Sequence, residues 1–388
     1  MKFIKEELCY LERHDLYRRL NTMDDSQASR TVVNGQSCLL FSSNNYLGLT
    51  EHPRLKAAAM EAIERWGTGA GGSRLTTGNL KLHKELENII ARFKNAPAAI
   101  VFNTGYMANL GAITALAGKE DIIFSDELNH ASIIDGCRLS RAKAKIFPHK
   151  DTTALEKLLQ QAHGYRRRLI VTDGVFSMDG DLAPLPRLVE LAEEYNALLM
   201  VDDAHATGVL GRRGAGTADH FGLEGKVHIQ MGTLSKAVGS VGGYIAGSRE
   251  LIDYLRNKAR SFIFSTALPP SVIASAMEAF QIIRDNPKIL QDLHFNAQYL
   301  RTGLKQMGFS ILAEESPIIP VFIGDADKTM QMAEKLFSLG VFAPGIRPPT
   351  VPPGTSRVRV TVMATHIRED LDRCLAAFAR AGQEVGII

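Results

Sequence analysis

Short apolar runs alternate along most of the chain with longer segments in which apolar residues recur at helical spacing. The runs are continuous rather than alternating, which is typical of strands buried on both faces. They predict strands at residues 99–102, 122–124, 169–171, 198–201 and 227–231. The segments between them predict amphipathic helices. Together these elements predict an α/β fold whose mainly parallel central sheet is covered by helices on both faces.

The pattern changes after about residue 286. Two helices, at 287–307 and 328–339, alternate with short strands, and an amphipathic helix ends the chain. This predicts a small α+β domain over residues 286–388. The large domain is expected over 46–285, and residues 1–45 are expected to form a helical arm.

Composition narrows the class of protein. The 388 residues carry 45 Lys and Arg against 42 Asp and Glu, a net charge of +3, and no clustered basic face that would indicate nucleic-acid binding. The four cysteines are far apart, which argues against a disulfide framework or a metal site. There is no apolar leader and no membrane-spanning stretch, so we expect a cytoplasmic enzyme or binding protein.

One glycine-rich segment matches a nucleotide-binding motif only by letter. Residues 67–72 read G-T-G-A-G-G, but a predicted helix at 55–66 precedes them where a dinucleotide site requires a strand. We interpret the segment as a tight loop near an active site.

An acid and a lysine follow two of the predicted strands. Asp202 and Asp203 end one strand, and Lys236 lies among small residues just beyond another. Ligands of α/β sheets bind at the carboxyl ends of strands. One of the two acids is expected to cap the next turn, and a lone lysine is more often a solvated surface group. A desolvated lysine near an acid, however, is what pyridoxal 5′-phosphate requires, because the lysine bonds the cofactor and the acid keeps its ring nitrogen protonated.

Other residues suit the same cofactor. Gly105 and Tyr106 follow a strand and begin a helix, where free amides can bind a phosphate. His130 is a candidate to cover the ring, although a lone histidine is more often structural. Arg357 and Arg359 alternate on one strand face. Arg359 suits either a substrate carboxylate or a solvated sheet face.

Six motifs in order make the chain recognisable: residues 43–49, 71–74, 175–181, 201–205, 233–236 and 264–266. Together they resemble the α-oxoamine synthases, which depend on pyridoxal phosphate and have the aspartate aminotransferase (type I) fold. The resemblance covers nearly the whole chain. Asp173 departs from it, because the family commonly has a glutamate at this position.

The resemblance implies a role for each matching residue. Lys236 would bond the cofactor and transfer protons, Asp202 would pair with the ring nitrogen, and His205 would reach its phenolic oxygen. His130 would stack on the ring. Further cofactor contacts would come from Gly105, Tyr106, Ser177 and Thr233, and from Ser265 and Thr266 of a neighbouring subunit, which implies a homodimer. Substrate contacts would come from Arg18 (or its rival Arg19), Asn44, His130, Thr350 and Arg359.

Residues 346–352 (IRPPTVP) resemble one branch of the family. That branch condenses L-alanine with a pimeloyl thioester, carried on CoA or on an acyl carrier protein, to give 8-amino-7-oxononanoate for biotin biosynthesis. The alternative branch, glycine C-acetyltransferase, condenses glycine with acetyl-CoA. Two non-enzymatic alternatives, a scaffolding subunit and the effector domain of a regulator, fit less well because Lys236 is present and only about forty residues precede the first motif.

Overall fold

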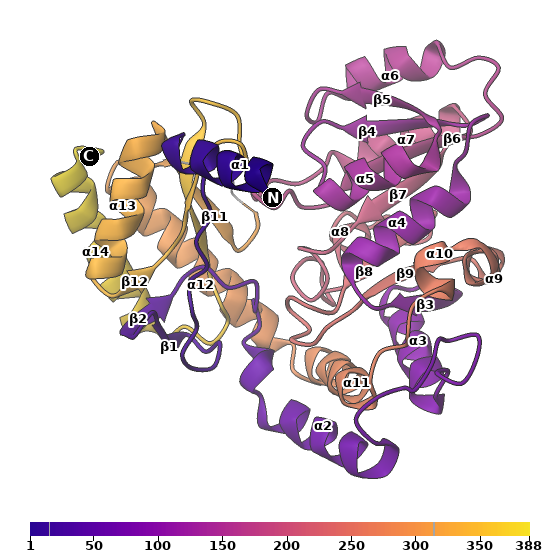
Figure 1. The fold of residues 1–388 in the computed structure, drawn as a ribbon, viewed down its shortest axis with the longest axis horizontal. Helices are drawn as coiled ribbons and strands as arrows, with labels where there is room; N and C mark the ends of the chain where they lie inside the picture. Colours follow the sequence, from indigo (N-terminus) through magenta and orange to yellow (C-terminus); the bar gives the residue numbers. More distant parts are fainter. Residues whose placement is uncertain (15, 313–314) are drawn as a thin grey trace.

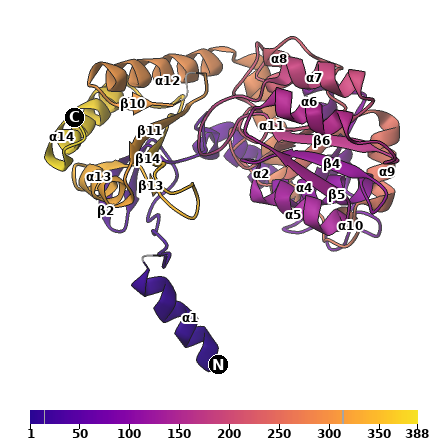
Figure 2. The ribbon, with the colours of Figure 1, turned by 90° about the horizontal axis from the view of Figure 1, so that it is seen from above.

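The computed structural model describes residues 1–14, 16–312 and 315–388. Figure 1 shows two lobes side by side, with most of the chain up to α11 (Pro270–Asp285) in one and the C-terminal part in the other. The long helix α12 (Lys288–Gln306) runs from the first lobe along the second, as the view in Figure 2 also shows. Among the described residues, no helix is long and apolar enough to span a bilayer.

The large lobe is built on a seven-stranded sheet. Its order is β3-β9-β8-β7-β6-β4-β5, and every neighbouring pair is parallel except those that involve β9. The strands are β3 (Ala98–Phe102), β4 (Ile122–Asp126), β5 (Lys143–Phe147), β6 (Arg168–Asp173), β7 (Leu198–Asp202), β8 (Ile229–Thr233) and β9 (Gly243–Gly247). The predicted mainly parallel sheet is therefore confirmed.

Helices cover both faces of this sheet, as predicted. One face packs against α4 (Gly105–Leu116), α5 (Ala131–Ser140), α9 (Arg249–Lys258) and α10 (Arg260–Ile263). The other packs against α3 (Lys81–Phe93), α6 (Thr152–Gln160), α7 (Leu185–Glu194), α8 (Thr217–His220) and α11, and α2 (Pro53–Trp66) lies against α11. Successive residues of each strand point to opposite faces, so both faces need apolar side chains.

The smaller lobe holds a four-stranded antiparallel sheet that packs against helices. Its order is β10 (Ser310–Ile311), β11 (Ile318–Gly324), β14 (Ser356–Thr361) and β13 (Gly345–Ile346). Helices α12, α13 (Ala326–Ser338) and α14 (Arg368–Val385) contribute to the same apolar core as β11 and β14. This is the small α+β arrangement that the pattern after residue 286 predicts.

The N-terminal segment is not the helical arm that we expected. Among the described residues before 45, only α1 (Lys2–Arg13) is helical, and β1 (Arg30–Val33) and β2 (Gln36–Leu40) form a hairpin. Strand β2 also pairs in parallel with β12 (Val341–Phe342), and Leu39 and Phe41 lie in the core of the smaller lobe. A strand partner some 300 residues away is not visible in local periodicity. A short 3-10 turn (Leu49–Glu51) then leads into the large lobe.

Candidate functional site

A cavity of about 240 Å³ lies at the carboxyl ends of the central strands. Strands β6 and β7 place Asp173 and Asp202 side by side in the sheet register, and Lys236 follows β8, the next strand along. The lining residues are Thr104, Gly105, Tyr106, Asn109, His130, Ser132, Asp173, Val175, Ser177, Asp202, Ala204, His205, Met231, Thr233, Ser235 and Lys236. The sheet topology therefore brings together residues from five separate stretches of the chain.

Lys236 is prepared to act as a nucleophile. Burial lowers the pKa of its ammonium group to about 8, although the negative charges of Asp202 and Asp173 partly oppose the shift. At neutral pH a useful fraction of the amine is therefore unprotonated, and an unprotonated amine can attack a carbonyl group.

The carboxylate of Asp202 is held in a fixed orientation. Its Oδ2 accepts a hydrogen bond from Asn109 Nδ2 at 2.7 Å, and its Oδ1 accepts one from the backbone amide of Ala204 at 2.8 Å. Burial and the neighbouring charge of Asp202 raise the pKa of Asp173 well above its usual value. The fixed carboxylate of Asp202 can therefore face a cation in the cavity, while Asp173 favours its neutral form.

Asp203, the other half of the sequence pair, is not part of the cavity. It forms a buried ion pair with Lys94 at 2.7 Å and accepts a hydrogen bond from the Thr217 hydroxyl. Asp202, not Asp203, is therefore the acid that faces the cavity. Asp203 has a structural role that includes the buried ion pair with Lys94 as well as its contact with Thr217.

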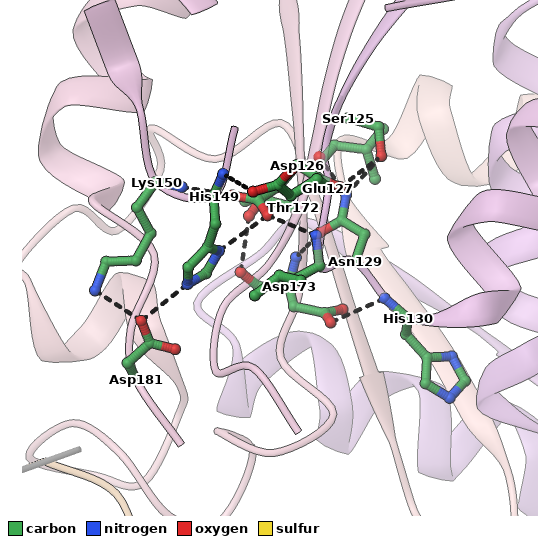
Figure 3. A network of polar contacts seen from close by, with 12 residues as sticks. Ser125, Asp126, Glu127, Asn129, His130, His149, Lys150, Thr172, Asp173 and Asp181 are labelled. Carbon is green, nitrogen blue, oxygen red and sulfur yellow. Dashed lines mark hydrogen bonds and ion pairs between the residues drawn. The ribbon is translucent and has the colours of Figure 1, made fainter. Parts of the chain in front are cut away.

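Two histidines approach the cavity as neutral rings. Burial and then the positive charges of Lys236 and Arg359 lower the pKa of His205 well below its usual value, and Tyr46 contacts its Nδ1 at 2.7 Å. Desolvation also lowers the pKa of His130. Figure 3 shows the His130 ring turned away from the polar network behind it. The carboxylate of Asp173 accepts a hydrogen bond from the backbone amide of His130 at 3.0 Å.

The start of α4 forms an anion-binding corner. Thr104 caps the helix by accepting from the amide of Met107, and the first amides of a helix have no intrahelical partner. A Cβ on Gly105 would lie 3.0 Å from the end of the Met231 side chain and 3.4 Å from Thr233, so a larger residue here would press on both side chains. A phosphate group fits this corner.

Arg359 reaches the large lobe from β14. It is only 6% exposed; its Nε donates to the Ser177 carbonyl at 2.6 Å, and a terminal nitrogen donates to Asn44 Oδ1 at 3.3 Å. The alternative of a solvated sheet face is therefore wrong for Arg359. It is also wrong for Arg357, which is 3% exposed and paired with Asp179.

Six of the predicted residues do not line the cavity of the single chain. Asn44 and Arg359 are two of them, and Arg359 connects both to the lining because it donates to the Ser177 carbonyl and to Asn44. Ser265 and Thr266 lie outside it, and Phe264 beside them is 71% exposed. Thr350 lies on an exposed loop, and Arg18 lies in the exposed stretch that follows α1. The glycine segment at 67–72 is also outside the cavity, and a β-bridge joins Ser73, just beyond the segment, to Thr266.

Sequence reasoning missed Asn109, Ser132 and Tyr46 as functional residues. Asn109 lies one helical turn after Gly105 and donates to both Asp202 and Ser132, and its own Oδ1 is buried without a partner. The i to i+4 spacing from Gly105 could have pointed to it. Tyr46 could be found only through its contact with His205.

The fold and the site define a pyridoxal-phosphate-dependent enzyme of fold type I. The cofactor fits because the cavity combines a reactive lysine, a fixed carboxylate and an anion-binding corner, as the sequence predicts. Lys236, Asp202 and the start of α4 are the groups that would hold it.

Comparison with known proteins supports the assignment to pyridoxal-phosphate-dependent enzymes of fold type I. The model of aminotransferase class I and II matches residues 36–378. The chain is 53% identical over 389 residues to the 8-amino-7-oxononanoate synthase of Geobacter metallireducens and 51% identical over 389 residues to that of Thermoanaerobacter pseudethanolicus. The alignments cover all of this chain and 100% and 98% of these relatives, respectively. A solved serine palmitoyltransferase of S. paucimobilis with a bound PLP–myriocin aldimine is 35% identical, with a TM-score of 0.94 over 99% of this chain and 98% of that one. The chain belongs to the α-oxoamine synthase family within aminotransferase class I and II.

Proposed function

We propose that this chain condenses L-alanine with a pimeloyl thioester to give 8-amino-7-oxononanoate, CO2 and the free thiol carrier, a step of biotin biosynthesis. The observation that carries the proposal is about 50% identity, over the full chain, to curated 8-amino-7-oxononanoate synthases. Lys236 and Asp202 in one cavity, with Arg359 hydrogen bonded to Ser177 of its lining, support it.

The reaction needs a carbanion at the alanine Cα. The carbanion forms a bond to the acyl carbonyl carbon, the C–S bond of the thioester breaks, and the Cα–carboxylate bond breaks to release CO2, with a proton returning to Cα. Pyridoxal phosphate, when bound, supplies the electron sink that makes such a carbanion accessible.

The residues of the chain supply the rest. The amine of Lys236 would remove the Cα proton, which its lowered pKa permits near neutral pH. Asp202 would keep a proton on the cofactor ring nitrogen, because Asn109 and Ala204 hold its carboxylate facing the cavity. His130 would cover the ring, and the neutral His205 would hydrogen bond to the phenolic oxygen. Arg359, with Asn44 beside it, would bind the alanine carboxylate through its planar guanidinium group.

The same proposal includes a homodimer with the active site at the subunit interface. Ser265 and Thr266 are absent from the cavity of their own chain, although they match phosphate contacts of the family. The exposed Phe264 and Thr266 suit a surface that a partner covers. A second copy would therefore supply these two residues. Arg18 and Thr350, both exposed here, are proposed to contact substrate in that assembly.

The substrate is tested with purified, cofactor-loaded protein and four substrate pairs. These are L-alanine with pimeloyl-CoA, L-alanine with pimeloyl acyl carrier protein, glycine with acetyl-CoA, and L-serine with palmitoyl-CoA, with products identified by mass spectrometry. We expect turnover with one or both alanine pairs. A preference for the glycine pair or the serine pair would overturn the proposal.

The role of the lysine is tested by Lys236→Ala. We expect turnover to fall at least about a thousandfold, because both the covalent hold on the cofactor and the proton-transfer group are removed. Lys226→Ala, on the surface of the same lobe, is the matched control and should retain full activity. Full activity in the Lys236 variant would refute the assignment.

A further inference from the structure

Behind the cavity, the imidazole of His149 lies between two carboxylates. Its Nδ1 is 3.0 Å from Asp126 Oδ1 and its Nε2 is 3.0 Å from Asp181 Oδ2, as Figure 3 shows. A neutral imidazole has one N–H group, whereas a protonated one donates from both nitrogens. Two carboxylate partners are therefore satisfied together only by the cationic ring. Burial alone would lower the pKa of His149, but the hydrogen bonds and charges of Asp126 and Asp181 raise it to about 9.

Both carboxylates are fixed by further contacts. The 2% exposed side chain of Asp126 accepts from the backbone amides of Leu128 and Lys150, each at 2.9 Å. Asp181 also accepts from Lys150 Nζ at 2.9 Å. We call His149, Asp126 and Asp181 the His149 clamp.

The remaining groups around the ring are also defined. Glu127 accepts from the backbone amide of His149 at 2.8 Å, so its carboxylate lies beside the clamp. The ring of Phe176 meets the imidazole edge to face at 4.4 Å. The charged groups that surround His149 are thus Asp126 at the end of β4, Glu127 just after it, Lys150 on the segment of His149 itself, and Asp181 on the loop after β6.

The clamp holds the loop that carries Ser177. The amide of Phe176 donates to the Asp181 carbonyl at 3.0 Å, which closes the loop at the two residues that His149 contacts. Ser177 lines the cavity and accepts from Arg359. One short loop therefore connects His149 to the guanidinium group of Arg359, which is proposed to face the substrate. A displacement of His149 would displace this loop and, with it, the guanidinium group.

The clamp also connects to His130. Asp126 begins the turn that contains Asn129, whose side chain accepts from the Asp173 amide at 2.8 Å and donates to the Val171 carbonyl at 2.8 Å. Asp173 in turn accepts from the His130 amide at 3.0 Å. Figure 3 shows this continuous chain of contacts from Asp181 to His130.

We propose that cationic His149 is a positioning residue that acts from outside the cavity, orienting Arg359 through the Ser177 loop and His130 through the turn after β4. The role in orienting Arg359 rests on the proposed function, in which Arg359 binds the carboxylate of the amino-acid substrate. The acyl thioester does not depend on this contact, so a defect in the clamp affects the two substrates unequally.

The test compares His149→Gln, Asp181→Asn and, as matched control, His163→Gln, an exposed histidine of the same lobe. At pH 7.5 we expect His149→Gln to raise KM for the amino acid about tenfold, since small displacements of a binding group have large effects, and to change KM for the thioester less than about twofold. His163→Gln should change neither. A merely structural role would lower the melting temperature without this split.

Asp181→Asn separates charge from geometry. The introduced amide can donate to or accept from Nε2, so the clamp tolerates both protonation states of His149. We expect a near-normal KM at pH 7.5, and above pH 9 a smaller rise in KM than in the unaltered enzyme. This variant also keeps the proposal testable if His149→Gln fails to fold.

A second measurement requires no turnover. Long-range ¹H–¹⁵N NMR of histidine-labelled protein reports the protonation of each ring nitrogen. We expect one imidazolium at pH 7.5 that titrates near pH 9 and is absent in His149→Gln. A neutral His149 at pH 7.5, or an unchanged KM for the amino acid in His149→Gln, overturns the proposal. If the enzyme prefers another substrate pair, the proposed function fails, but the same KM comparison on that pair still tests the clamp.

Discussion

At the scale of single residues, two adjacent aspartates have different tasks. Neighbouring residues at a strand end point in opposite directions, so Asp202 meets Asn109 and the cavity while Asp203 meets Lys94 below the sheet. The local pattern indicated that one of the two would be structural but not which, and only the family resemblance assigned Asp202 to the cofactor. The partner of Asp203 decided this. No local pattern shows that partner, because Lys94 lies more than a hundred residues earlier in the chain.

Substitution should separate these two roles. Asp203→Asn leaves the buried ammonium of Lys94 without its charge partner, and we expect a loss of about 3 kcal/mol in the free energy of unfolding. Asp202→Asn should retain most of the stability and lose at least about a hundredfold in turnover, because the ring proton of the cofactor is no longer held. Urea unfolding and a turnover assay on both variants check this; equal effects in both assays would contradict it.

The protonation of His149 should also affect stability. Its pKa is raised from the ordinary value near 6.5 to about 9, so the folded state binds the proton more tightly than the unfolded state. The resulting stabilisation is fully present below about pH 6.5 and is lost as pH rises through 9. We expect the unaltered protein to lose about 2 kcal/mol more than His149→Gln over this interval. Urea unfolding at pH 6 and pH 9.5 measures the difference, and parallel losses would contradict the prediction.

At the scale of elements, the buried parallel strands were predictable and two others were not. Strand β5 lies at the sheet edge and four of its five residues are exposed, so it lacks a continuous apolar run. Strand β9 begins and ends with glycine and forms the only antiparallel pairings of the sheet among the described residues. The predicted run at 227–231 is shifted, since β8 extends over Ile229–Thr233. The bounds of a strand depend on the strands with which it pairs, and local periodicity in the sequence does not indicate those partners.

Gly243, which begins β9, allows the start of α4 to lie close to this strand and so fixes the position of the anion-binding corner. A Cβ on Gly243 would come within 2.5 Å of the Thr104 carbonyl and 2.6 Å of Gly105 Cα, both of them backbone atoms that cannot easily move. We expect Gly243→Ala to cost about 2 kcal/mol of stability and to weaken cofactor binding, because the start of α4 is displaced. Gly118→Ala, whose Cβ would have no neighbour closer than 3.9 Å, is the control. Absorbance titration with pyridoxal phosphate measures the binding; equal affinity in the two variants would contradict this explanation.

At the scale of the whole molecule, the active site depends on both lobes. Arg359 and Arg357 come from β14 and contact the loop after β6, and Ser316 donates to the Gly180 carbonyl of that loop at 2.6 Å. Arg359, the proposed substrate-binding group, and the proposed cofactor-binding groups therefore meet only when the lobes are correctly placed. The proposed dimer extends this dependence to a second chain.

Subunit mixing tests the shared active site. Lys236→Ala and the double variant Ser265→Ala/Thr266→Ala should each be weakly active as homodimers. Mixed by refolding, they should form heterodimers in which one of the two sites has neither defect, so that activity returns to about a quarter of the unaltered level, as random pairing of two chain types requires. No recovery, with heterodimers verified by mass, would contradict the proposed sharing.

The sequence by itself determined the class of this protein. Buried strands need continuous apolar runs and a cofactor needs particular side chains, so both leave local signals, and Lys236, Asp202 and the start of α4 could be read directly. Only the tertiary structure decided the partners: the Asp203–Lys94 pair, the Tyr46–His205 contact, the hairpin that replaces most of the expected arm, and the clamp around His149. These contacts join residues far apart in the chain, and their energies depend on burial and on charges nearby in space, neither of which is encoded in local spacing.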